Sequence, residues 1–450
     1  MNIQLSEHFN YKKMLRFTLP SIVMMIFTSV YSVVDGFFVS NFVGKTPFAA
    51  VNFIMPFLMV LGAFGFMFGT GGSALISKTM GEGDNEKAKH IFSLLIYVSI
   101  GCGVVIAVLG IIFIRPVAAL LGAEGEMLDN CVLYGRIILA ALPAFMLQYE
   151  FQSLFVTAEK PQLGLAVTVA AGVTNMVLDA LLVAVFSLGL VGAAAATALS
   201  QCVGGLVPLV YFGCKNSSAL RLTRTEFDGK ALLRTCTNGI SELLSNISMS
   251  VVGILFNMQL IKYSGENGVA AYGVLMYVNF IFLAIFIGYS VGTAPLIGYN
   301  YSARHYKRIK AALKLDFLVS FMVALVGTIF LFTCAGPIVQ AFIDDAETVR
   351  YGQRFQRIIC ITGPCISVTM LAITAFQSVG KKVQPTILSL MRKGGLDIPF
   401  MFLLNGLLGV NGIVWATPIA DVCAMIVAVI VLVPFWKMLS SQEKKDPAGT

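Results

Sequence analysis

The chain has 450 residues, of which 57% are hydrophobic and only 12% charged, with a formal net charge of +8. A soluble protein of this length carries about a quarter charged residues, so this composition excludes a soluble globular domain and predicts an integral membrane protein. Its nine Cys occur without a Cys-x-x-Cys motif, which argues against a metal site or a disulfide framework.

Apolar runs of about 20 residues, long enough to cross ~30 Å of hydrocarbon as a helix, follow one another along the whole chain. The first is not followed by a small-residue cleavage site, so we expect it to stay as a membrane helix. The sequence therefore predicts an all-α membrane protein with twelve transmembrane helices: 17–40, 48–77, 91–114, 131–157, 163–186, 190–213, 235–261, 269–299, 312–334, 350–379, 385–405 and 410–436.

Orientation follows from the basic residues, because Lys and Arg near the ends of spans are retained in the cytoplasm. We expect both termini inside, since this places every Lys and Arg on the inner side except seven: Lys45, Arg115, Arg136, Lys262, Arg350, Arg354 and Arg357. The positive charge then reflects topology and contact with anionic lipids of the bilayer rather than binding of nucleic acid.

The sequence also repeats itself. Residues 48–57 (FAAVNFIMPF) align without a gap with residues 269–278 (VAAYGVLMYV). Further along, residues 189–201 (GLVGAAAATALSQ) align with residues 409–421 (GVNGIVWATPIAD). The chain is therefore an internal duplication.

We expect two six-helix lobes, residues 1–220 and 221–450. Because each copy has an even number of helices, both enter the membrane in the same direction, as parallel repeats. Two such bundles facing each other enclose a central cleft, which is the arrangement that substrate transporters use for alternating access.

Several motifs carry a resemblance to a known family: GTGGSALISKTMGEGD at the end of the second span, PLIGYNYSARHYKRIK after the eighth, Leu19–Pro20 in the first, and FQSVGKK closing the tenth. With the acid Asp35 in the first span, the sequence resembles the multidrug and toxic compound extrusion (MATE) family, in its bacterial MepA-like branch. The resemblance implies a monomeric, non-enzymatic transporter of the bacterial inner membrane. It also implies efflux of bulky, often cationic drugs and dyes, driven by inward flow of H⁺ or Na⁺, with no cofactor besides that coupling ion.

Asp35 lies in an apolar run, where a charge at the bilayer centre costs about 2.5–3.5 kcal/mol. At ~1.5 Å per residue, Asp35 lies ~22 Å above the inner end of its helix, Asp179 ~24 Å and Thr197 ~20 Å. Asn175 precedes Asp179 by four residues and shares its helix face. No basic residue lies on these spans, so a proton or a metal ion is left as the neutralising partner.

Two carboxylates, an amide and a hydroxyl supply four oxygen ligands of the kind that hard cations prefer, and two adjacent acids also favour uptake of a proton. In MATE proteins an acid in helix 1 and an Asn-x-x-x-Asp pair in helix 5 form a cation site. The resemblance implies this role for Asp35, Asn175 and Asp179, and the depth of Thr197 adds it as a fourth ligand. The alternative is that these polar groups only join helices by hydrogen bonds.

Other intramembrane acids compete with this site. Asp397 and Asp421 also reach the middle of the membrane, and Lys393 precedes Asp397 by four residues, the spacing of a neutralising helical ion pair. Glu150 and Asp316 fall near the inner interface, where we expect their side chains to reach water.

Two other functions fit a two-bundle membrane protein. A flippase for lipid-linked oligosaccharide precursors requires several basic residues in the cleft to offset a pyrophosphate, and the spans hold few. A membrane receptor or scaffold has no need of a duplication or of unpaired acids. The sequence favours the transporter, with Met- and Phe-rich runs such as residues 53–69 offering adaptable surfaces to flat hydrophobic molecules.

Overall fold

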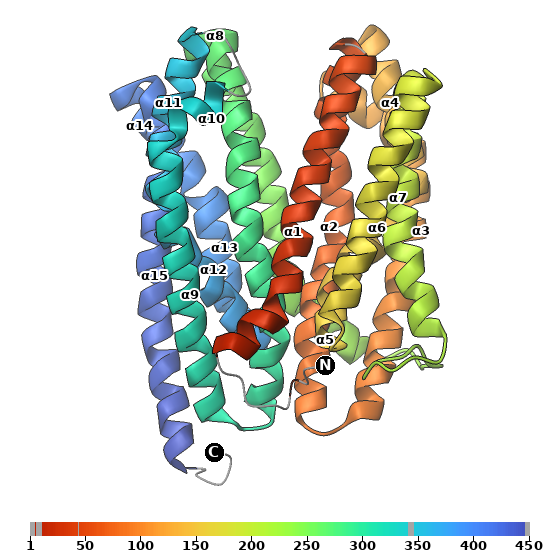
Figure 1. Cartoon of the computed structure of the whole chain (residues 1–450), viewed down its shortest axis with the longest axis vertical. Coiled ribbons are helices and arrows are strands. Elements are labelled where there is room, and N and C mark those ends of the chain that lie inside the picture. Colours follow the sequence, from red (N-terminus) through yellow and green to blue (C-terminus); the bar gives the residue numbers. More distant parts are fainter. Residues whose placement is uncertain (1–4, 6–10, 44, 341–345, 446–450) are drawn as a thin grey trace.

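The computed structural model describes residues 5, 11–43, 45–340 and 346–445, and these form helices and loops with no strand among them. Two helical bundles stand side by side (Figure 1). The first contains α1 (Tyr11–Phe38), the π-helical turn η1 (Val39–Val43), α2 (Lys45–Gly81), α3 (Asn85–Leu120), α4 (Gly125–Ala140), α5 (Leu142–Thr157), α6 (Pro161–Leu178), the π-helical turn η2 (Asp179–Val185) and α7 (Gly189–Gly213). The second contains α8 (Gly229–Ser302), α9 (Tyr306–Thr333), α10 (Ala335–Gln340), α11 (Ala346–Cys360), α12 (Gly363–Ser378), α13 (Val383–Leu390), the π-helical turn η3 (Met391–Gly395), α14 (Asp397–Leu408) and α15 (Val410–Lys445).

The predicted crossings are confirmed, though several are not single straight helices. Among the described residues, nine helices are long and apolar enough to span a membrane. Two further crossings are bent pairs, α4 with α5 at 58° and α11 with α12 at 48°. Pro143 and Pro364 lie in the first turn of the second helix of each pair, where the N–H that proline lacks is not needed, whereas a helix continuing through them would need it. The remaining predicted span, 385–405, falls on α13, η3 and α14, none of which is long enough to be counted as a spanning helix.

The 74 residues of α8 supply two crossings rather than one. The rings of Phe256 and Tyr272 stack at a centroid distance of 5.4 Å. In a straight helix these residues would lie ~24 Å apart along the axis. The chain therefore reverses between them, and the two arms pack together around Phe256, Leu260 and Leu275.

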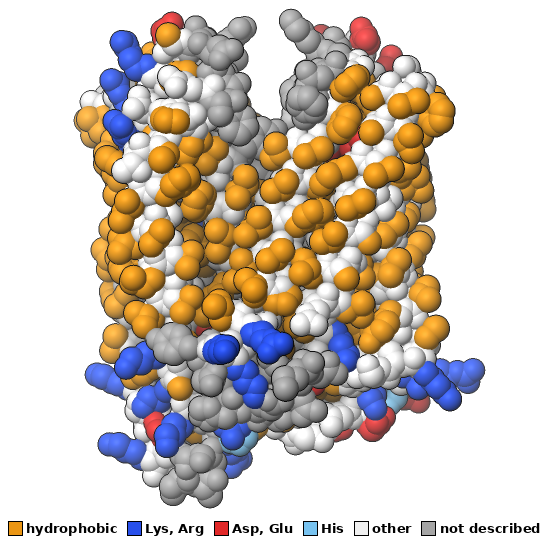
Figure 2. All heavy atoms as spheres, viewed as in Figure 1, with side chains coloured by type: hydrophobic (Ala, Val, Ile, Leu, Met, Phe, Trp, Pro, Cys, Tyr) orange, Lys and Arg blue, Asp and Glu red, His pale blue; other side chains and the backbone are white. Residues whose placement is uncertain are grey.

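An apolar belt surrounds the middle of the molecule, and Lys and Arg gather mainly at one end, here called the basic end (Figure 2). The α2–α3 loop, the α8–α9 loop and the C-terminus of α15 all lie at that end (Figure 1). Corresponding loops of the two repeats thus share one side of the belt, as parallel repeats require. The exact lobe boundary at residue 220 stays a prediction.

Glycines bring the two bundles into close contact toward the basic end. A Cβ atom on Gly71 of α2 would meet the backbone of α8 at Thr235, and one on Gly239 of α8 would meet the backbone of Met67. Gly292 of α8 similarly packs against Thr18 of α1. The two bundles are therefore packed together toward the basic end.

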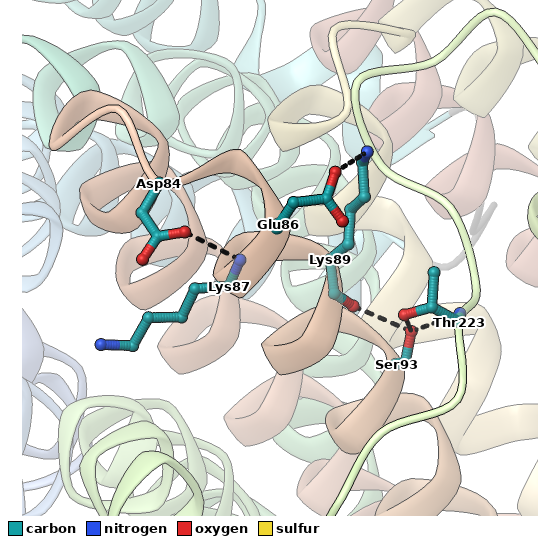
Figure 3. A network of polar contacts seen from close by, with 6 residues as sticks. All are labelled: Asp84, Glu86, Lys87, Lys89, Ser93 and Thr223. Carbon is teal, nitrogen blue, oxygen red and sulfur yellow. Dashed lines mark hydrogen bonds and ion pairs between the residues drawn. The ribbon is translucent and has the colours of Figure 1, made fainter.

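The segment between α7 and α8 joins the bundles and is fastened to the start of α3. Ser93 receives a hydrogen bond of 2.9 Å from the backbone N–H of Thr223, and donates one of 2.8 Å to the carbonyl of Lys89. Figure 3 shows this contact beside the Glu86–Lys89 ion pair of 2.8 Å. The connector is thus held at the basic end of the first bundle.

Cys214 offers a direct test of orientation, because it begins the connector and its side chain is exposed. If the basic end is cytoplasmic, a membrane-impermeant maleimide should label Cys214 only after cells are permeabilised. Cys214→Ser gives the background, and Glu124→Cys, an exposed site at the opposite end, should label in intact cells. Labelling of Cys214 from outside intact cells would reverse the topology.

Candidate cation site in the N-terminal lobe

The four residues predicted for the cation site converge inside the first bundle. The Thr197 hydroxyl of α7 donates a hydrogen bond of 3.4 Å to Oδ1 of Asp35 on α1. Asn175 of α6 and Asp179 at the start of η2 approach the same carboxylate. Asn175 and Asp179 are buried, whereas Asp35 and Thr197 are half-buried.

Three of the side-chain oxygens in this cluster have no hydrogen-bond donor among the described residues. Both carboxylate oxygens of Asp179 and the amide oxygen of Asn175 are buried without a hydrogen-bond partner among the described residues. No Lys, Arg or His is among the groups that act on either acid in the described part of the chain. Two adjacent carboxylates cannot both stay ionised in a low-dielectric interior without a cation. The cluster is therefore suited to bind a proton or a hard cation.

Local backbone features support the cluster. A π-helical turn begins at Asp179, and another follows Asp35 by four residues. Such turns occur often at functional sites, because the extra residue re-aims the side chains around it. Gly172, one turn before Asn175, lets α6 approach α1 so closely that a Cβ there would meet the rings of Phe27 and Tyr31.

Gly172→Val should therefore push α6 away from α1 and loosen the cation site. Overpacking of this kind costs about 1–3 kcal/mol, so we expect drug efflux to fall at least severalfold at normal expression. Gly101→Val is the matched control, because Gly101 is an exposed helical glycine with no atom near its Cβ position. Equal efflux by the two variants would show that this approach of α1 and α6 has no bearing on transport.

Sequence reasoning missed two aromatic members of the site. Tyr134 of α4 is buried and lies close to Thr197, Asp35 and Asp179. Tyr31, one helical turn before Asp35, interacts with it and with Gln148. Their phenol groups are polar, but a Tyr in an apolar helix is more often a packing residue, so spacing alone gave no signal for either.

The competing acids of the C-terminal lobe are arranged differently. Asp397 and Asp421 are buried, and Asp421 accepts a hydrogen bond of 3.3 Å from Thr362. The expected ion pair between Lys393 and Asp397 is wrong, since among the described residues no ion pair involves either side chain. Lys393 lies in η3, and a π-helical turn removes the four-residue register on which such a pair depends.

A central cavity of about 160 Å³ lies between the bundles. Residues of α1, α2 and α5 form one wall, and residues of α8, α12 and η3 form the other. The lining mixes Met and Phe side chains with hydroxyls and amides, including Met25, Phe66, Thr70, Asn246, Met370 and Gln377.

Two parallel six-helix bundles around a shared central cavity define the fold of a secondary membrane transporter. The model of the MatE family matches residues 20–181 and 243–403, one match in each half of the chain. The chain belongs to the MatE family of multidrug and toxic compound extrusion proteins.

Individual relatives agree with this assignment. The chain is 29% identical to the multidrug export protein MepA of Staphylococcus haemolyticus over 94% of this chain and 93% of that one. It is 27% identical to MepA of Staphylococcus aureus with the same coverage. Solved structures of a MATE protein in complex with MaL6 and of an outward-facing multidrug resistance MATE transporter superpose with TM-scores of 0.91 and 0.90. Both are 23% identical and cover 98% of each chain, which confirms the fold.

Proposed function

We propose that the protein is a secondary active multidrug efflux transporter that exports lipophilic, often cationic compounds in exchange for H⁺ or Na⁺. The observation that carries this proposal is the unneutralised pair Asp35 and Asp179 inside a two-lobe transporter fold. Export of several drugs is the named activity of the MepA relatives. The site of action is then the bacterial inner membrane, with both termini in the cytoplasm and one chain as the working unit.

The coupling ion binds at Asp35, Asn175, Asp179 and Thr197. In the state open to the outside, an ion enters this cluster and neutralises the two acids. Charge neutralisation removes the cost of keeping the carboxylates in the bilayer interior, so the loaded lobe can change conformation and release the ion inside. No cofactor other than this ion takes part, and the protein acts as a transporter rather than an enzyme.

The central cavity favours drugs over lipid-linked pyrophosphates. Among the described residues that line it, Arg392 is the only basic one, and the carboxylate of Glu242 lies near it. A pyrophosphate requires several cations or charge-assisted donors. A flippase for oligosaccharide precursors and a receptor or scaffold therefore stand as alternatives with less support.

Substrate charge gives the test of this function. Cells that express the protein should accumulate severalfold less ethidium than cells with an empty vector. The described lining of the central cavity offers an anion one basic side chain, Arg392, and the nearby Glu242 offsets its charge. An anionic dye of similar size, such as fluorescein, should accumulate equally in both strains. Equal export of both dyes, or of neither, at confirmed expression would count against the proposal.

A further inference from the structure

The end of the molecule opposite the basic end carries a cluster of arginines that the proposed function does not use. Arg350, Arg354 and Arg357 follow one another on α11 at spacings of four and three residues, so they share one face of the helix. All three side chains are exposed, whereas Val349 and Phe355 on the other face are buried. The buried face fixes α11 to its lobe, and the arginines therefore point away from it.

The arginines line a surface groove of about 340 Å³ between α9 and α11. Apolar side chains form much of the remaining lining: Phe332 of α9, Ile358 of α11, and Ile361 between α11 and α12. No acid is among the described residues that line the groove. The groove thus combines a row of cations with an apolar wall.

This groove lies at the edge of the apolar belt. Helix α9 begins at the basic end, and its 28 residues extend ~42 Å, more than the ~30 Å of hydrocarbon in a bilayer. Phe332, the last residue but one, therefore lies where hydrocarbon gives way to headgroups. One and two turns before it, Ile329 and Val326 are 56% and 63% exposed. Figure 2 shows basic side chains at the upper left beside the belt, where Figure 1 places α11.

The guanidinium groups of the groove have no acidic partner within 4.0 Å among the residues that the structure describes. Arg115, toward the same end of the molecule, is in contrast paired with Asp129 at 3.2 Å. Arg357 is held in place by Phe332: its Nε donates a hydrogen bond of 3.3 Å to the carbonyl, and its guanidinium carbon lies 5.4 Å from the ring centroid. This contact leaves the terminal amino groups of Arg357 for a ligand.

We propose that this groove binds an anionic phospholipid of the surrounding bilayer, in the leaflet opposite the basic end. The phosphate oxygens accept hydrogen bonds from the arginines, whose planar guanidinium groups match phosphate with two parallel bonds. The acyl chains lie against Phe332 and the exposed apolar face of α9. A free phosphate would use the arginines but leave this apolar wall uncovered. The site is separate from the proposed function, because neither the coupling ion nor the drug takes part.

A tryptophan at the groove reports which lipids touch it. The chain has two tryptophans, so Ile361→Trp is made in a background of Trp415→Phe and Trp436→Phe. The protein is reconstituted in mixtures of phosphatidylcholine and phosphatidylglycerol, one of which has brominated chains that quench fluorescence on contact. One basic residue near an anionic lipid is worth about fivefold in affinity. The fluorescence should therefore show a preference for phosphatidylglycerol of about fivefold or more.

Two double variants separate the arginine cluster from total charge. Arg350→Gln with Arg354→Gln should lower the preference to about twofold or less, since one arginine of the cluster is left. Arg115→Gln with Lys262→Gln removes the same charge from exposed positions elsewhere and should leave the preference unchanged. Both leaflets of the vesicle have one composition, so this readout does not depend on the orientation of the protein.

A second reporter position and a second measurement complete the test. Phe186→Trp, made in the same background, lies exposed just beyond η2 on a crossing without a basic residue between Lys160 and Lys215, and should show no preference. Phosphatidylglycerol added to the purified protein, with its own tryptophans intact, should raise the Tm of the parent by more than that of the double variant at Arg350 and Arg354.

Three results would overturn the lipid site. The first is equal preference at the two reporter tryptophans, and the second is an unchanged preference after both arginines are replaced. The third is displacement of phosphatidylglycerol by millimolar inorganic phosphate, which would mean that the groove takes a free anion instead of a lipid. Loss of drug efflux with the lipid preference intact would refute the proposed function alone.

Discussion

Cells that express Asp35→Asn protein should accumulate ethidium to the level of cells without the transporter. Asparagine keeps the volume of aspartate and can still bond to Thr197, but it cannot bind and release a charge. One charge that crosses the membrane supplies about 2.3 kcal/mol per 100 mV, and a variant that cannot bind the coupling ion loses this driving force. Asp179→Asn should have the same effect, because its carboxylate completes the pair.

Thermal stability distinguishes a specific loss of efflux in these two variants from misfolding. Removal of a buried carboxylate without a cation removes a desolvation cost, so the Tm of both variants should equal or exceed that of the parent. Asp129→Asn, which changes an exposed acid paired with Arg115 at 3.2 Å, should transport normally. Near-normal efflux by Asp35→Asn at normal expression would mean that Asp35 only joins helices, and Asp421 would be the next acid to test.

Gly71→Val should also abolish efflux, by preventing closure of the basic end. A side chain at Gly71 would meet the backbone of α8 at Thr235 and Gly239, and no rotamer change can relieve a contact with backbone. Overpacking of about 1–3 kcal/mol shifts a two-state equilibrium by roughly 5- to 150-fold. The state open to the outside should therefore become rare.

Reactivity of an introduced cysteine reports this shift. Ser77 is buried at the contact between the lobes, where it packs against Gly298. In a Cys214→Ser background, Ser77→Cys should react slowly with maleimide, and addition of Gly71→Val should make it react quickly. Gly101→Val serves as the matched control. Normal efflux by Gly71→Val, with Ser77→Cys still protected, would show that the tight contact between α2 and α8 is not needed.

The sequence could predict that the four cation-site residues lie at one depth in the membrane: Asp35, Asn175, Asp179 and Thr197. This was possible because helical rise is regular and every crossing spans the same thickness of membrane. Depth along the membrane normal therefore follows from residue number alone. The direction in which each side chain points does not, since it depends on how the helices rotate against one another. For this reason Tyr134, whose helix α4 packs against the site, could not be selected from other aromatic residues.

Breaks within helices were a second feature that the sequence predicted only in part. Pro143 lies inside the predicted span 131–157 and signals the bend between α4 and α5, but the 58° angle depends on packing. The π-helical turn η3 ends in Gly394–Gly395, and a Gly-Gly pair is a break signal. The spacing of Lys393 and Asp397 was read as that of a regular helix despite this signal.

The prediction that Glu150 and Asp316 reach water was also wrong. Both side chains are fully buried. Asp316 accepts a hydrogen bond of 2.9 Å from the Tyr289 hydroxyl, whereas both carboxylate oxygens of Glu150 lack a partner among the described residues. Burial at this depth depends on which helix face meets a neighbour, and residue number does not reveal that face.

Ion-coupled export is tested most directly in proteoliposomes. A pH gradient and a Na⁺ gradient are imposed across the membrane in separate experiments, and ethidium uptake is the readout. The parent protein should concentrate the dye in the lumen only when H⁺ or Na⁺ is allowed to flow out of it, and Asp35→Asn protein should not concentrate it under either gradient. Concentrative uptake without any ion gradient, or equal uptake by Asp35→Asn protein, would contradict coupling through the acid pair.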